Sequence, residues 1–126
     1  MRCKIATLDQ MGAAIGSLTK YAELSTPMNE ETKYYLRVVL NELITNSLKY
    51  GGGGSLNEVH VEVSVKGESL VVTVDDGGRG IDARMLGKCS DVYSEGGRGL
   101  AIVKGLCNSV HLNPAGNRVT ASLSIS

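Results

Sequence analysis

The chain contains 126 residues, which is enough for one domain with one hydrophobic core. Basic and acidic residues both number 13, so no net charge attracts nucleic acid or an anionic membrane. No apolar stretch is long enough to span a bilayer, and three cysteines without paired spacing indicate reduced thiols. We therefore expect a single cytoplasmic domain over residues 1–126, with neither nucleic acid nor membrane as a partner.

The first half of the chain predicts one strand and two helices. Residues 2–8 are expected to form a short edge strand. Apolar residues at three-and-four spacing indicate a helix over residues 9–24, with Asp9 as its N-cap. A second helix is expected over residues 29–50, because Asn29 and two acidic residues make a favourable helix start.

The second half predicts a hairpin, a loop and a third helix. Residues 58–66 alternate between valine and polar residues, which is typical of a half-buried strand, and a second strand follows at 70–74. A polar loop over 82–96 precedes a helix that opens at Gly97. The expected apolar side of this helix consists of Leu100, Ile102, Val103, Leu106 and Cys107.

Two short strands, at 110–112 and 119–125, close the chain. The order of the elements predicts an α+β fold, a two-layer α/β sandwich with helices on one face of a mixed, mainly antiparallel sheet.

Ten of the 16 glycines gather in three clusters, at 51–54, 77–80 and 96–99. Clustered glycine in a small chain favours a backbone that approaches a ligand closely. Flexible linkers are the alternative, and they suit the first cluster better than the other two.

The predicted strand 70–74 runs directly into Asp75 and Asp76, so Asp76 lies at the end of a strand. A carboxylate at this place is expensive to bury unless a donor meets it, and the amino group of adenine is such a donor. Gly78 and Gly80 would let the backbone pass close to a flat base. Guanine carries a carbonyl where adenine carries the amine, so such a site would select adenine. A plain acidic turn is the alternative.

The predicted helix start at residues 97–100 (GRGL) is a candidate anion site. Free backbone amides and the positive end of the helix dipole attract phosphate, and Arg98 would add a charged donor. The alternative is a helix start whose glycines serve packing.

Glu42 and Asn46 stand four residues apart on the second predicted helix, so they share one side of it. The side-chain carbonyl of asparagine is a suitable ligand for Mg²⁺, and a glutamate one turn earlier is placed to accept a proton from an attacking hydroxyl or water. Lys49 lies one turn further, where it would reach a phosphate or be solvated. For Glu42 the alternative is a solvated helix carboxylate.

Together these segments resemble the GHKL (Bergerat-fold) ATPase superfamily. Residues 42–51 (ELITNSLKYG) are similar to its N box, residues 76–81 (DGGRGI) to its G1 box and residues 97–100 to its G2 box. The resemblance covers about residues 30–126. It implies ATP and Mg²⁺ as cofactors, with Glu42 as catalytic base, Asn46 on the metal and Asp76 on the adenine amine. The other implied nucleotide-binding positions are Lys49, Gly78, Gly80, Ile81, Gly97, Arg98, Gly99 and Leu100.

Within the superfamily, the short N-terminal strand and helix, the short loop and the Gly-Arg-Gly-Leu form are similar to the anti-sigma-factor serine/threonine kinases. That branch phosphorylates a serine of an anti-anti-sigma partner and holds a sigma factor in an ATP-dependent way, commonly as a dimer. Two alternatives stay open: a non-catalytic ATP-gated protein-binding module, and a stand-alone catalytic domain of a sensor histidine kinase. His60 and His111 lie in strand-like stretches, which disfavours a complete sensor kinase.

The chain departs from the superfamily before its last strand. Members often carry Gly-Thr-Thr or Gly-Thr-Ser there, and a threonine helps to hold the adenine through water. Here Gly116 is followed by Asn117 and Arg118, so the resemblance supplies no residue for that contact.

Overall fold

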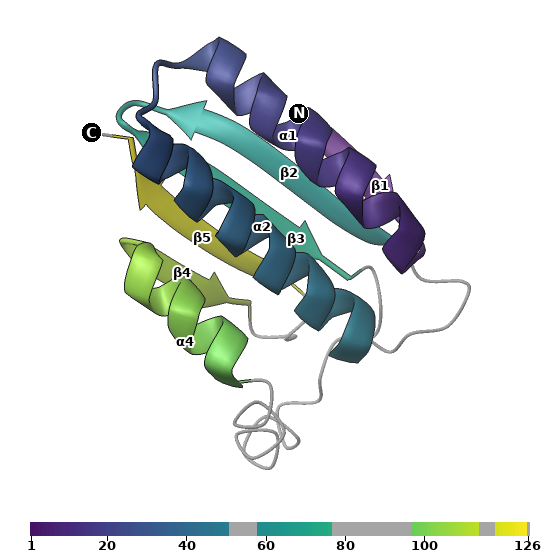
Figure 1. Ribbon diagram of the computed structural model, residues 1–126. Coiled ribbons are helices and arrows are strands. Elements are labelled where there is room, and N and C mark those ends of the chain that lie inside the picture. The colour runs from purple at the N-terminus through teal and green to yellow at the C-terminus, as the bar shows by residue number, and fades with distance from the viewer. Residues whose placement is uncertain (51–57, 77–96, 114–117, 126) are drawn as a thin grey trace.

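The computed structural model describes residues 1–50, 58–76, 97–113 and 118–125, without the side chains of residues 49–50 and 97–100. The described residues form two layers, a five-stranded sheet and a layer of helices on one of its faces (Figure 1). The strands are β1 (Arg2–Ile5), β2 (Val59–Lys66), β3 (Ser69–Asp75), β4 (Ser109–Leu112) and β5 (Arg118–Ser124). The helices are α1 (Met11–Ser25), preceded by the 3-10 turn η1 (Leu8–Gln10), α2 (Glu30–Tyr50) and α4 (Gly97–Leu106).

The α+β sandwich expected from the sequence is confirmed, and so is the order of its strands and helices. The sheet order is β1-β2-β3-β5-β4, and all four described pairings are antiparallel, where a mixed, mainly antiparallel sheet was expected. The last strand explains why no parallel pair occurs among the described strands. The chain returns through α4 with β4 running in the direction of β3, but β5 inserts between them and runs opposite to both.

The β2–β3 hairpin supplies the middle of the sheet. Val59, Val61 and Val63 are buried beneath the helices, as their alternation predicted. Lys66 pairs with Ser69, so only two residues form the turn, and Gly67 adopts a φ of 60° at its first position. A glycine at this position is typical of the type II′ turn, whose twist matches that of the flanking strands.

The two long helices start differently. The side-chain Oδ1 of Asn29 accepts a hydrogen bond from the backbone N–H of Thr32 at 2.8 Å, which makes Asn29 the N-cap of α2 and confirms the helix start expected there. The prediction of Asp9 as the N-cap of the first helix is wrong. Asp9 lies inside η1, and Gln10 stands at the N-cap position of α1 instead. The chain already turns at η1, so Asp9 is in a helical path before α1 begins.

The core lies between the two layers. The main contribution of α2 is a stripe of five fully buried side chains, Leu36, Val39, Leu40, Leu43 and Ile44. From α4, Val103 is fully buried, whereas Ile102 is 46% exposed, so its expected place on the apolar side is wrong. Neighbouring residues on a helix point about 100° apart, so with Val103 facing the core Ile102 is turned away. No helix in the described part of the chain is long and apolar enough to cross a membrane.

Candidate functional site

Three of the segments singled out from the sequence come together at one end of the molecule. The last turns of α2, the end of β3 and the beginning of α4 lie at the same end of the sandwich (Figure 1). This follows from the topology, because α2 and β3 run toward this end and α4 starts from it. α2 packs against both β3 and α4.

Asp76 is a buried carboxylate at this end of the sheet. The residue is 6% exposed, and it continues the alternation of β3, in which Leu70, Val72 and Val74 are buried on the side of the helices. The strand therefore delivers Asp76 to the interface between the sheet and the helical layer. Burial of a charged group is costly unless hydrogen-bond donors meet it, so the Asp76 carboxylate makes this end of the interface a polar site.

Asn46 carries a second polar group at this interface. Its side-chain Nδ2 is buried and has no hydrogen-bond partner among the described residues. A buried amide without a partner costs about 1–3 kcal/mol, so it is a rare feature and points to a bound group. A half-turn of the side chain exchanges Nδ2 with Oδ1, which lets Asn46 either donate to a phosphate oxygen or offer its carbonyl to a metal ion. The residue therefore fits the expected magnesium ligand.

Glu42 lies one turn before Asn46 on α2. Its side chain is partly exposed, whereas its neighbours Leu43 and Ile44 are fully buried in the core. The buried stripe fixes the helix, so Glu42 lies beside the core on the partly exposed side of α2. A partly exposed carboxylate is able to accept a proton from a group that reaches it.

Comparison with known families identifies the fold. A sequence model described as the histidine kinase-like ATPase domain matches residues 5–123, nearly the whole chain. The chain belongs to this family. The resemblance to the GHKL superfamily is thereby confirmed, and the chain is an ATP-binding domain of this type. A comparison with curated proteins found no match.

The other positions predicted for this ATPase domain fall in two groups. Lys49 lies in the last turn of α2, and residues 97–100 form the first turn of α4, which confirms the predicted helix start. Their side chains are outside the described residues. The predicted positions in the G1 segment, Gly78, Gly80 and Ile81, also lie outside the described residues, as does the expected loop 82–96.

The ATPase domain carries one further feature near the site that sequence reasoning missed. Asp75 and Arg118 form an ion pair on the face of the sheet opposite to the helices, with Arg118 Nε and Nη2 donating to Asp75 Oδ2 at 3.1 and 3.0 Å. A signal was present in the alternation of β3, which places Asp75 and Asp76 on opposite faces.

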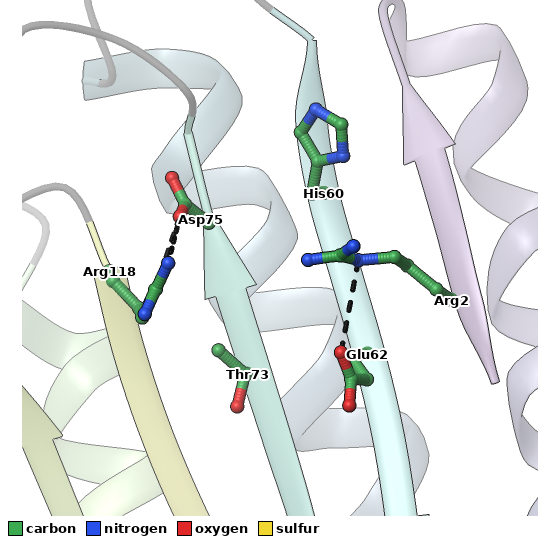
Figure 2. Close-up of a pocket in the computed structure, with 6 residues that line it drawn as sticks. All are labelled: Arg2, His60, Glu62, Thr73, Asp75 and Arg118. Carbon is green, nitrogen blue, oxygen red and sulfur yellow. Dashed lines mark hydrogen bonds and ion pairs between the residues drawn. The ribbon is translucent and has the colours of Figure 1, made fainter.

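The ion pair borders a hollow on this outer face. The hollow has a volume of about 200 Å³ and is lined by Arg2, His60, Glu62, Thr73, Asp75 and Arg118 (Figure 2). Because it opens on the opposite face from Asp76 and the helices, it is separate from the candidate nucleotide site.

Proposed function

We propose that this ATPase domain is a cytoplasmic serine/threonine protein kinase of the anti-sigma-factor type. It transfers the γ-phosphoryl group of ATP to a serine of an anti-anti-sigma-like protein, binds a sigma factor as a second partner and works as a homodimer of the single domain over residues 1–126. The observation that carries the proposal is the pair on α2, a buried amide without a described partner on Asn46 and a partly exposed carboxylate on Glu42 one turn away.

The nucleotide is held from two sides in this proposal. The carboxylate of Asp76 accepts a hydrogen bond from the adenine amine, and the glycines of the G1 segment leave room for the base. At the other end, the backbone amides in the first turn of α4 face the phosphates, where the positive end of the helix dipole adds to their attraction.

Asn46 and Glu42 divide the chemistry between them. Asn46 would hold Mg²⁺ through its side-chain carbonyl, and the bound ion would neutralise the negative charge that develops on the phosphoryl oxygens. The serine hydroxyl of the partner attacks the γ-phosphorus, so a serine O–P bond forms while the bond from phosphorus to the β,γ-bridging oxygen breaks and ADP leaves. Glu42 accepts the hydroxyl proton as this happens.

The direct test has two steps. Calorimetric titration with ATP and GTP, each with and without Mg²⁺, is expected to give magnesium-dependent binding of ATP in preference to GTP. Labelled ATP is then supplied together with an anti-anti-sigma protein from the same genome, and label is expected on a serine of that protein.

The alternatives predict different results in the second step. ATP-dependent capture of the partner without transfer of label indicates an ATP-gated binding module. Label on a histidine of a separate helical protein indicates the catalytic domain of a sensor kinase. Absence of ATP binding in the first step contradicts the kinase proposal itself.

A further inference from the structure

Asp75 and Asp76 are neighbours in the chain, but the sheet sends their side chains to opposite faces. Asp76 is buried on the helical side, and Asp75 points to the outer face, where it meets Arg118 (Figure 2). Asp75 and Arg118 stand directly opposite each other in the β3–β5 register. Asp75 is the last residue of β3 and Arg118 the first of β5, so the ion pair joins the two strands at the end that carries Asp76.

Arg118 is also fixed through its main chain. Its N–H donates to the side-chain Oδ1 of Asn113 at 3.0 Å, and the N–H of Asn113 donates to the carbonyl of Arg118 at 2.9 Å. Asn113 directly follows β4. Arg118 therefore links the ends of three strands, with its main chain bonded beside β4 and its side chain bonded to β3.

The geometry of this link bears on Asp76. Two guanidinium nitrogens bond to the same carboxylate oxygen, and the Asp75 side chain is 22% exposed although that of Arg118 is 53% exposed. The pair therefore has better geometry than a single long-range surface contact but stays partly exposed. β3 ends at Asp75, and the next residue is Asp76, whose carboxylate would accept a hydrogen bond from the adenine amine. Strand ends open locally unless something holds them. The place of the Asp76 carboxylate therefore depends on how firmly Asp75 is held.

We infer that Arg118 is a positioning residue for adenine recognition, which it supports by fixing the end of β3 through Asp75. This inference rests on the proposed contact between Asp76 and the adenine amine. Arg118 thereby has a role in the segment where the chain departs from the Gly-Thr pattern of its superfamily. The arginine acts from the outer face of the sheet, without touching the nucleotide, and so affects selectivity for the base rather than affinity for the phosphates.

The chain contains a matched control on the same face. Arg2 and Glu62 form an ion pair between β1 and β2, with a distance of 3.8 Å between Arg2 Nε and Glu62 Oε2 (Figure 2). They are likewise directly opposite in their register, and they line the same hollow. This pair is longer and more exposed than the pair of Asp75 and Arg118. Glu62 is opposite Thr73 rather than the end of β3, so Arg2→Gln removes a cross-strand charge pair from the same face without reaching Asp76.

The experiment measures the affinities of ATP and GTP for the wild-type chain and for R118Q, R118K, R2Q, D76N and the double variant D76N/R118Q. We expect R118Q to lose about fivefold in ATP affinity, the size of one partly exposed ion pair, and to keep its GTP affinity. R118K is expected to lie between R118Q and the wild type. R2Q is expected to match the wild type.

The double variant separates positioning from general stability. If Arg118 acts through Asp76, R118Q has no further effect on base selectivity once Asp76 is already Asn. If R118Q loses ATP and GTP affinity equally, its selectivity for ATP is unchanged and the inference is overturned. The proposed function still stands in that case, provided that the wild-type chain prefers ATP to GTP. A wild-type chain without preference for ATP over GTP, or with a preference that D76N leaves intact, overturns both the role of Asp76 and the inference.

Discussion

The side-chain oxygen of Asn29 accepts a hydrogen bond from the backbone N–H of Thr32 and so caps the helix that carries Glu42 and Asn46. Asn29→Ala leaves that N–H without its partner, and we expect the free energy of unfolding to fall by about 1 kcal/mol. Asp9→Ala is the matched control, because Asp9 is exposed and lies inside η1 rather than at the start of α1. Urea denaturation of both variants measures the difference. Equal losses in the two variants would contradict the capping role.

Asp76→Asn tests whether Asp76 recognises the adenine amine. The amide keeps the shape of the carboxylate but loses its negative charge and one of its two acceptor oxygens, so any hydrogen bond that it accepts from the adenine amine is weaker. We expect ATP affinity to fall by about tenfold or more, because a hydrogen bond to a charged group is lost. Calorimetry measures the affinity, and circular dichroism checks that the fold is retained. Unchanged ATP affinity would remove Asp76 from the site.

Asn46→Ala separates function from stability. The buried Nδ2 has no partner among the described residues, so its removal takes away an unsatisfied group. We expect the nucleotide-free variant to be as stable as the wild type or more stable by up to about 1 kcal/mol, and to lose the magnesium-dependent part of ATP affinity.

The control for Asn46→Ala is Asn41→Ala, on the exposed side of the same helix, which should change neither quantity. Thermal unfolding with and without Mg-ATP compares the two variants. Clear destabilisation of the nucleotide-free Asn46→Ala chain would instead indicate a structural amide.

Glu42→Gln tests the proposed base. Glutamine keeps the size and the hydrogen-bonding reach of glutamate but cannot take up the hydroxyl proton. We expect ATP binding to be unchanged and phosphoryl transfer to fall by about 10²-fold or more. The two quantities are measured on the same preparation, by calorimetry and by label transfer to the partner. Transfer at the wild-type rate would mean that another group, or water, accepts the proton.

Cys107 predicts a pH dependence of stability. Burial raises the pKa of its thiol from 9.0 to about 11. Above pH 9 the unfolded chain releases the thiol proton first, so the thiol's contribution to stability is complete below about pH 9 and is lost as the pH rises toward about 11.

Cys107→Ala removes this contribution. We expect the free energy of unfolding to fall less steeply with pH in the variant than in the wild type over this window. Urea denaturation at several pH values gives both slopes, and identical slopes would show that the thiol is not buried as described.

The strands and helices with regular spacing of apolar residues could be predicted from sequence, because that spacing is set within each segment. The valines of β2 and the stripe on α2 required nothing from the rest of the chain. Ile102 was misplaced because a continuous apolar run in α4 fits several helix faces, and the neighbouring layers decide which face is buried.

The candidate site shows the same division between local and long-range information. Asp76 could be singled out from its place at the end of a strand. The bond between Asp75 and Arg118 joins residues 43 positions apart, and only the β3–β5 register places them opposite each other. The prediction of Asp9 as an N-cap was wrong for a local reason, because nothing in the sequence indicated that the 3-10 turn η1 precedes α1.

The two-residue turn at Gly67 has a consequence for the order in which the chain assembles. β2 and β3 need to close only this turn to pair, whereas β1 must find β2 across most of the helical layer, with Ile5 opposite Val59. Short closures cost less chain entropy and form faster than long ones. The hairpin is therefore expected to serve as an early folding nucleus, and β1 to dock late and to be among the first strands to detach when the domain is strained.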